Sequence, residues 1–212
     1  MNINKNELKL YAITDRSWLK DGQSLVEQVD DAIDGGATII QFREKFLQGE
    51  ELENLARELL LLCQKKDVKL IINDDVNLAK KINADGVHVG QSDMDVIEAR
   101  KILGFNKIIG ATAKTIEQAK EAQKAGADYL GSGAIFGSKT KTDAKPMDLK
   151  LFNDICDAVD IPVVAIGGIN IGNVEALRDT KMDGIAVISG IFATENIKME
   201  ARKLRNFMDS RA

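Results

Sequence analysis

Short apolar runs rich in β-branched residues alternate along the chain with longer stretches in which apolar residues recur at helical spacing. Most of the short runs are continuously apolar, which is typical of parallel strands covered on both faces. The pattern predicts eight strands, at Leu10–Thr14, Thr38–Arg43, Lys69–Asp74, Gly86–Gly90, Lys107–Thr112, Tyr129–Gly133, Pro162–Gly167 and Gly184–Ser189.

The stretches between the strands predict helices. Leucines recur every three or four residues in Glu50–Lys66 and mark one apolar face. Thr115 and Asp95 are expected to cap helices, because each precedes a Gln or Glu by three residues. Further helices are expected at Leu25–Asp34, Thr115–Ala125 and Ile171–Thr180.

Four segments resemble one another, namely DGGATIIQFR, INADGVHVG, KAGADYLGSG and TKMDGIAVISG. Each reads as the end of a helix, a small residue and then a strand. Eight strands in strict alternation with helices fit a closed barrel better than an open sheet, which usually has five or six strands. We therefore expect residues 1–212 to form a single-domain (β/α)8 barrel of the TIM type, with tight loops except for a long segment after Gly133.

Composition and charge restrict the classes of partner. The chain has 44% hydrophobic and 29% charged residues, which is typical of globular proteins, and a formal net charge of −4. We expect no nucleic-acid or membrane partner, because positive charge is not in excess and no apolar run is long enough to span a bilayer. The beginning of the chain does not resemble a secretory signal. A cytoplasmic location is expected, and a homo-oligomer remains open.

Cysteine and histidine are too sparse for a typical zinc or iron–sulfur site. Cys63 and Cys156 lie far apart without a CxxC pair, so we interpret both as reduced core residues. His88 is the only histidine, which excludes any mechanism that needs two. We expect it to be a hydrogen-bonded core residue.

Polar residues follow the predicted strands at their carboxyl ends, where barrels of this class have their active sites. Arg43 and Lys45 are two residues apart, so in an extended segment they would point the same way and could surround a diphosphate together with Lys141. Asp74 and Asp93 follow neighbouring strands. They could share one Mg²⁺, which favours one or two carboxylates plus substrate phosphate oxygens. The alternatives are solvated loop charges and helix-capping aspartates.

The ends of the last two strands suggest a second anion site. Gly168 and the turn Ile188-Ser189-Gly190 resemble a monophosphate site built from backbone N–H groups. The residues thus indicate two anions in one pocket.

Taken in order and spacing, these motifs resemble the thiamine-phosphate synthase family. The resemblance extends from Leu10 to about Phe207 and rests on five segments: Arg43-Glu44-Lys45, Asn73-Asp74, GVHVGQ (86–91) with Asp93, the Thr140-Lys141 segment and AIGGI (165–169). The family transfers a hydroxymethylpyrimidine group from its diphosphate to the nitrogen of a thiazole phosphate and releases diphosphate.

The resemblance implies three groups of site residues. The pyrimidine diphosphate would be bound by Gln41, Phe42, Arg43, Glu44, Lys45, Asn73, Thr112 and Lys141. The thiazole phosphate would be bound by Ser138, Lys139, Thr140, Gly168, Ile188 and Ser189. Mg²⁺ would be held by Asp74 and Asp93, and Arg43, Lys45 and Lys141 would be catalytic.

The chain departs from the family pattern around the fifth and sixth strands. Thr112 stands where serine is usual, Lys114 where histidine or asparagine is usual, and Gly133-Ala134 where Gly-Pro is expected. We expect these changes to affect loop rigidity and efficiency more than the reaction.

Two other functions compete with this reading. A related thiazole tautomerase lacks the paired Arg-x-Lys and Asn-Asp motifs and relies on a histidine near strand five. A non-catalytic barrel that binds phosphate ligands would not need both proposed magnesium ligands.

Overall fold

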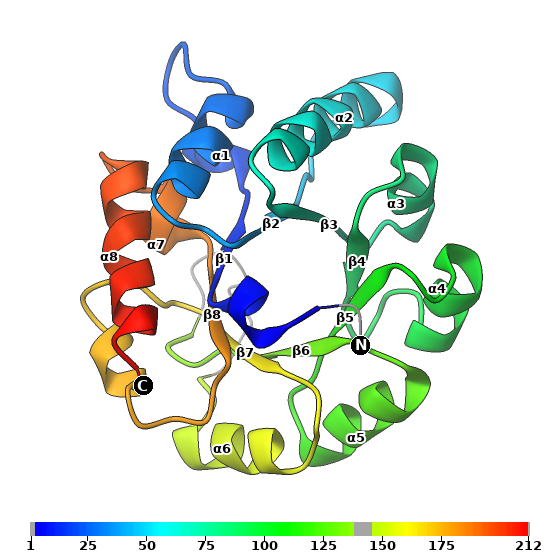
Figure 1. The fold of residues 1–212 in the computed structure, drawn as a ribbon, viewed down its shortest axis with the longest axis vertical. Coiled ribbons are helices and arrows are strands. Elements are labelled where there is room, and N and C mark those ends of the chain that lie inside the picture. The colour runs from blue at the N-terminus through cyan, green and yellow to red at the C-terminus, as the bar shows by residue number, and fades with distance from the viewer. Residues whose placement is uncertain (1–2, 138–145, 212) are drawn as a thin grey trace.

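Eight parallel strands close into a barrel in chain order, so that β1 pairs with both β2 and β8 (Figure 1). The computed structural model describes residues 3–137 and 146–211. The predicted (β/α)8 barrel is confirmed. The strands are β1 Leu10–Ile13, β2 Ile39–Phe42, β3 Lys69–Asn73, β4 Gly86–Val89, β5 Ile108–Thr112, β6 Tyr129–Gly133, β7 Val163–Ile166 and β8 Gly184–Val187.

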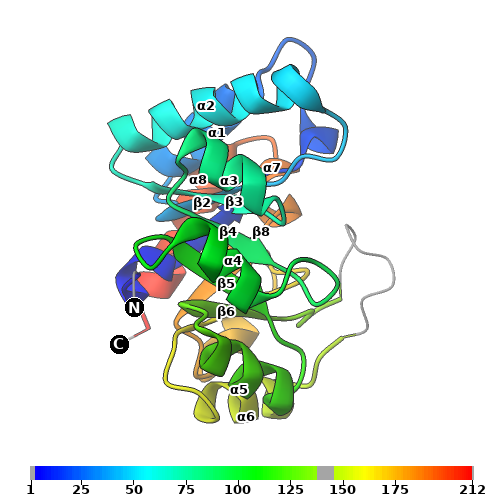
Figure 2. The same cartoon turned by 90° about the vertical axis from the view of Figure 1, so that its right-hand side faces the viewer.

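Helices surround the strands on the outside, as the end-on and side views both show (Figures 1 and 2). They are α1 Leu25–Asp34, α2 Gly49–Lys65, α3 Val76–Ile82, α4 Val96–Leu103, α5 Ile116–Ala125, α6 Leu149–Asp157, α7 Ser189–Phe192 and α8 Ile197–Asp209. Short 3-10 helices are η1 Lys5–Leu8, η2 Arg16–Trp18 and η3 Val174–Leu177. The expected caps are confirmed: Thr115 accepts from Gln118 N and Asp95 from Glu98 N. In the described part of the chain, no helix is long and apolar enough to cross a membrane.

The helix expected at Ile171–Thr180 is wrong, because only η3 forms there. Asn170 Oδ1 accepts the N–H of Gly172 at 2.8 Å, and Asn173 Oδ1 accepts the N–H of Asn170 at 2.9 Å. These local bonds offer the backbone an alternative to helical bonds. Gly172 lowers the helix propensity further.

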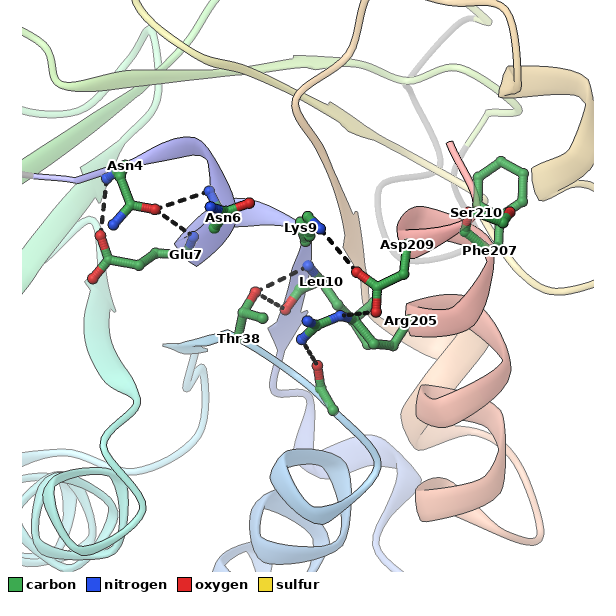
Figure 3. Close-up of polar contacts among 11 residues, drawn as sticks. Asn4, Asn6, Glu7, Lys9, Leu10, Thr38, Arg205, Phe207, Asp209 and Ser210 are labelled. Carbon is green, nitrogen blue, oxygen red and sulfur yellow. Dashed lines mark hydrogen bonds and ion pairs between the residues drawn. The ribbon is translucent and has the colours of Figure 1, made fainter. Parts of the chain in front are cut away.

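Apolar side chains pack in two layers. The larger layer lies between strands and helices, and the smaller one fills the barrel with side chains such as Ile39, Ile71 and Val164. Alternate residues of each strand point to opposite faces, which divides the apolar runs between the two layers. At the amino ends of the strands, Leu8 of η1 joins the inner layer, and η1 is held by a capping box between Asn4 and Glu7 (Figure 3).

The four similar sequence segments share one structural contact. In each segment, the residue before an even-numbered strand donates its N–H to a residue of the preceding odd-numbered strand. Its side chain accepts the N–H of that same residue at 2.9–3.0 Å. The four are Thr38, Asp85, Asp128 and Asp183, and they bond to Leu10, Leu70, Ile109 and Val163 respectively (Figure 3 shows the first pair). The sequence repeat therefore reflects a repeated pair of hydrogen bonds at the amino end of the barrel.

The last helix closes the ring against the first strand. Lys9 Nζ lies 2.9 Å from Asp209 Oδ1, and Arg205 Nε donates to Asp209 Oδ2 at 2.8 Å (Figure 3). The termini of the fold are thus joined at the amino end of the barrel, away from the carboxyl ends of the strands.

Candidate active site

A pocket opens inside the barrel at the carboxyl ends of the strands, and all eight strands or the residues just after them contribute to it. Its lining is Tyr11, Ile13, Gln41, Arg43, Asn73, Asp74, His88, Gly90, Thr112, Tyr129, Gly131, Val164, Ile166, Ala186 and Ile188. Six of the residues expected at the site are therefore brought together: Gln41, Arg43, Asn73, Asp74, Thr112 and Ile188.

Arg43 is the lysine or arginine that lines this pocket among residues 3–137 and 146–211, and it is almost fully buried. Its backbone N–H donates to Thr14 Oγ1 at 2.9 Å, and its carbonyl accepts from the same hydroxyl at 3.1 Å. Asp15 Oδ2 lies 3.7 Å from Arg43 Nη1. The end of β1 thus fixes both the backbone and the charge of the residue after β2.

The segment after Arg43 bends instead of continuing as a strand. Glu44 Oε1 accepts the N–H groups of Lys45 and Phe46 at 2.8 and 2.7 Å, and the chain bends at Lys45. Lys45 is exposed and does not line the pocket. The extended geometry assumed for Arg43 and Lys45 is therefore absent, and the role of Lys45 at a diphosphate remains a prediction.

Phe42 and Glu44 also lie outside the pocket lining. Phe42 packs in the apolar layer between strands and helices, as the alternation along β2 requires. Only 2% of the Glu44 side chain is exposed, and its Oε2 lies 3.6 Å from Arg16 Nε, so this carboxylate joins the loops after β1 and β2. Substrate contacts of both residues remain predictions.

Asp74 and Asp93 are both hydrogen-bonded to the end of β4, Asp74 through its N–H to the carbonyl of His88 and Asp93 through its carboxylate. Asn73 Nδ2 donates to Asp74 Oδ2 at 2.6 Å, and Asp74 has a left-handed backbone with φ of +63°. Asp93 Oδ2 accepts the N–H of Gly90, a pocket residue, at 2.8 Å.

This donor set fits Mg²⁺ better than a metal caged entirely by protein. Within residues 3–137 and 146–211, no group of three or more His, Cys, Asp or Glu side chains could hold a metal ion. Mg²⁺ is usually bound by one or two carboxylates and completes its coordination with water and substrate phosphates. The binding of Mg²⁺ by Asp74 and Asp93 remains a prediction.

The expected monophosphate site has a backbone that only glycine suits. Gly168 has φ of +69°, and a Cβ there would lie 2.9 Å from Phe136 O and 3.0 Å from Gly137 O. Asn173 Nδ2 donates to the carbonyl of Gly168 at 2.9 Å and fixes this turn. Ser189 begins α7, next to the pocket residue Ile188. Ser138, Lys139, Thr140 and Lys141 lie outside the described residues.

Three polar residues of the pocket lining were not expected there from the sequence. Tyr11 and Tyr129 were not among the expected site residues, and His88 was expected in the core. Tyr11 Oη lies 2.7 Å from Tyr129 Oη, and Tyr129 Oη lies 3.0 Å from His88 Nδ1. His88 Nε2 lies 3.1 Å from Thr112 Oγ1, which confirms that the histidine is hydrogen-bonded. Burial raises the pKa of both tyrosines well above the usual range. Both hydroxyls therefore keep their protons at neutral pH.

A sequence signal for these residues existed in the strand alternation. On β2 Gln41 faces the inside, and on β1 and β6 Tyr11 and Tyr129 share the same inner layer as Ile39. Polar residues at inward positions of a barrel are candidates for its site.

Comparisons with known proteins agree with one another. Residues 10–191 match the family model for thiamine monophosphate synthase. A thiamine-phosphate synthase of Clostridium novyi is 48% identical over 97% of this chain and 100% of its own length, and one of Clostridium tetani is 45% identical over 97% and 99%. The solved structure of a thiamine phosphate pyrophosphorylase from Pyrococcus furiosus superposes with a TM-score of 0.89 at 40% identity and covers 97% of this chain and 98% of that one.

Proposed function

The chain belongs to the thiamine monophosphate synthase family, and from that premise we propose the reaction that it catalyses. It transfers the 4-amino-2-methylpyrimidin-5-ylmethyl group from its diphosphate to the ring nitrogen of a thiazole phosphate. The products are thiamine phosphate and diphosphate. The observation that carries the proposal is a buried arginine, Arg43, that lines a pocket at the catalytic end of a barrel together with one carboxylate, Asp74, and the amides of Gln41 and Asn73.

The electron balance of this reaction matches the side chains at the site. The bond between the methylene carbon and the diphosphate oxygen breaks, and its electron pair leaves with diphosphate. The lone pair of the thiazole nitrogen forms the new C–N bond, and no proton needs to be removed. The protein therefore has to supply position and charge rather than a base or a covalent nucleophile.

Arg43 is the described residue best placed to receive the leaving diphosphate. It is held by Thr14 and Asp15 before any ligand arrives, so little reorganisation is needed as negative charge develops. Lys45 and Lys141 are proposed to add charge from the two loops that carry them. A Mg²⁺ ion bound by Asp74 and Asp93 would supply further positive charge to the diphosphate.

The remaining lining residues divide between the two substrates. We assign Gln41, Asn73 and Thr112 to the pyrimidine, because all three present polar groups to the pocket. Gly168, Ile188 and Ser189, with Ser138, Lys139 and Thr140, are assigned to the thiazole phosphate. The turn at Gly168 supports this assignment, because it keeps side-chain atoms away from the backbone.

The proposal includes a cytoplasmic location. Cys63 and Cys156 are both free thiols, which is usual in a reducing compartment.

The test mixes the protein with the pyrimidine diphosphate, the thiazole phosphate and Mg²⁺, and detects thiamine phosphate after oxidation to its fluorescent derivative. We expect product that requires both substrates and disappears when Mg²⁺ is chelated. Isomerisation of a thiazole phosphate alone would indicate a tautomerase, and tight binding of both ligands without product would indicate a binding protein.

A further inference from the structure

Five polar side chains from five strands form one continuous hydrogen-bond chain across the barrel, in the order Gln41, Tyr11, Tyr129, His88 and Thr112. We propose that Tyr11 and Tyr129 are positioning residues that hold the Gln41 amide with its carbonyl oxygen toward the pocket, so that the site selects an aminopyrimidine over an oxopyrimidine. The inference rests on the proposed function and deepens it, because it concerns how the site recognises the base of the diphosphate substrate.

The direction of every bond in the chain follows from the first one. Gln41 Nε2 donates to Tyr11 Oη at 2.9 Å, so the proton of Tyr11 is directed to the oxygen of Tyr129, 2.7 Å away. Only one proton can lie between two hydroxyl oxygens. Tyr129 must therefore direct its own proton to His88 Nδ1.

The same reasoning fixes the histidine and the far end of the chain. A neutral imidazole that accepts at Nδ1 carries its proton on Nε2. That proton is donated to Thr112 Oγ1 at 3.1 Å. The hydroxyl proton of Thr112 is then left for another acceptor.

The two ends therefore present opposite hydrogen-bonding groups to the pocket. Gln41 offers its Oε1 as an acceptor, which has no hydrogen-bond partner among the described residues, and Thr112 offers a donor. A 4-aminopyrimidine carries a donor amino group beside an acceptor ring nitrogen. The amino group of the 4-amino compound can donate to Gln41 Oε1, whereas the oxygen of the 4-oxo compound would meet that same oxygen as a second acceptor.

Reversal of the chain would require every member to change together. If the amide of Gln41 were turned, Tyr11 would donate to Gln41, Tyr129 to Tyr11 and His88 to Tyr129. The cooperative chain thus resists rotation of the amide more than one hydrogen bond would. Removal of either tyrosine hydroxyl interrupts the hydrogen-bond chain, and the amide of Gln41 can then rotate and direct its nitrogen to the pocket.

Burial and packing keep the chain in place. Tyr11 and Tyr129 are at most 1% exposed, with ring centroids 5.8 Å apart, and burial raises the pKa of each hydroxyl so that neither loses its proton. A Cβ at Gly110 would lie 2.1 Å from Tyr129 Cζ, so the space occupied by that ring depends on a glycine of the neighbouring strand.

The first experiment measures discrimination by binding. The affinities for the 4-aminopyrimidine diphosphate and its 4-oxo analogue are determined by calorimetry without the thiazole phosphate, in wild-type protein and in Tyr11→Phe and Tyr129→Phe. We expect the wild type to bind the amino compound at least about 100-fold more tightly. In each variant the ratio of the two affinities should fall at least about tenfold, mainly because the variant binds the 4-oxo compound more tightly than the wild type does.

Ser132→Ala is the matched control. Ser132 carries a fully buried hydroxyl on the same strand as Tyr129, but this hydroxyl bonds to Met147 and is not part of the hydrogen-bond chain from Gln41 to Thr112. We expect its amino-to-oxo ratio to equal that of the wild type. A ratio that survives in both tyrosine variants, or that falls equally in Ser132→Ala, would overturn the inference.

A second experiment examines the chain without any substrate. His88 is the only histidine, so nitrogen NMR of histidine-labelled protein reports on one ring. At pH 8 we expect the Nε2–H tautomer in the wild type and a shift toward a mixture of tautomers in Tyr129→Phe. The Nδ1–H tautomer in the wild type would contradict the proposed direction.

These outcomes are distinct from failure of the proposed function. A wild-type protein that makes no thiamine phosphate would contradict the function. The inference fails when binding does not discriminate as described or when the histidine has the other tautomer, whether or not product forms.

Discussion

Asp15 and Arg43 form an ion pair inside the protein, with 3.7 Å between Oδ2 and Nη1 and only 10% and 7% of the two side chains exposed. Removing one member of a buried pair leaves an uncompensated charge, which commonly costs about 3–5 kcal/mol. Asp15 is held in turn by the hydroxyl and backbone N–H of Ser17, at 2.6 and 3.1 Å. The loop after β1, which carries Asp15 and Ser17, therefore holds the charge of Arg43 in the pocket.

Asp15→Asn should lower the free energy of unfolding by about 3 kcal/mol, because Arg43 then lies buried without a counter-charge. Inorganic diphosphate with Mg²⁺ should raise the thermal midpoint of this variant more than that of the wild type, since the ligand replaces the lost carboxylate. Thermal unfolding with and without diphosphate checks both effects. Asp154→Asn breaks an exposed pair with Lys150 and serves as control, with an expected change below about 1 kcal/mol. Equal ligand shifts in Asp15→Asn and wild type would contradict the prediction.

Asp93→Ala should lower turnover strongly while the fold is kept. Loss of charge stabilisation by a metal can cost several kcal/mol, and about 1.4 kcal/mol corresponds to tenfold in rate. The measurement is turnover against Mg²⁺ concentration, together with Mn²⁺ binding in the presence of diphosphate.

Asp95→Ala is the matched control for the metal, because Asp95 lies two residues away and caps α4. It should lower stability by about 1 kcal/mol without changing the dependence on Mg²⁺. Wild-type activity of Asp93→Ala at limiting Mg²⁺ would remove this aspartate from the site.

Gly168→Val should weaken the binding of the thiazole phosphate much more than that of the pyrimidine diphosphate. The new side chain would collide with Phe136 O and Gly137 O and force the turn away from the substrate. Gly104→Val separates this effect from backbone strain, because Gly104 also has positive φ but nothing lies within 4 Å of its Cβ position. Calorimetric titration with each substrate gives the comparison. Equal weakening for both substrates would indicate general distortion instead.

Asp128→Ala should be among the most destabilising changes away from the pocket. Asp128 Oδ2 accepts from Arg100 Nη2 at 2.7 Å and from Ile109 N at 2.9 Å, and the residue is only 5% exposed. Its loss leaves the guanidinium of Arg100, whose side chain is only 11% exposed, without a counter-charge and the N–H of Ile109 without that acceptor, so the free energy of unfolding should fall by about 3 kcal/mol. Urea unfolding provides the value, and kcat should remain close to that of the wild type. Thr38→Val removes the equivalent side-chain hydrogen bond to Leu10, which involves no charge, and should lower the free energy of unfolding by less.

The fold could be predicted because its signals are local and repeated. The apolar runs predicted the ends of each strand to within two residues. The segments that contain Thr38, Asp85, Asp128 and Asp183 repeat because each of these residues makes the same pair of hydrogen bonds to the preceding strand. The exception was Ile171–Thr180, where the side chains of Asn170 and Asn173 bond to nearby backbone and outweigh a periodicity that fitted a helix.

The site could be predicted only where strand ends define it. Arg43 and Asp74 follow their strands directly and Asn73 ends β3, so position alone brought them together. Tyr11 and Tyr129 are 118 residues apart and meet only because the barrel closes, which no local pattern reveals. The direction of Lys45 depends on a bend that Glu44 creates through its own carboxylate, and such a bend overrides the alternation of an extended chain.

The last prediction separates a dissociative reaction from direct displacement. In a dissociative reaction the pyrimidine methylene becomes cationic before the thiazole nitrogen bonds to it. Because the site is proposed to supply cations for the leaving diphosphate and no base, we expect this order. Replacing the methyl group of the pyrimidine by the electron-withdrawing CF₃ should slow the chemical step by orders of magnitude, since it destabilises that cation. Single-turnover kinetics at saturating substrates isolates this step from binding and release.

Lys141→Ala should slow the same step with little change in the affinity for the pyrimidine diphosphate, because the charge on Lys141 would matter most as diphosphate leaves. Lys150→Ala removes an exposed cation of α6 that is paired with Asp154, and its single-turnover rate should equal that of the wild type. A CF₃ analogue that reacts as fast as the natural pyrimidine would rule out the cationic intermediate. Lys141 would then act in the ground state, and its replacement should raise the dissociation constant of the diphosphate substrate instead of lowering the rate.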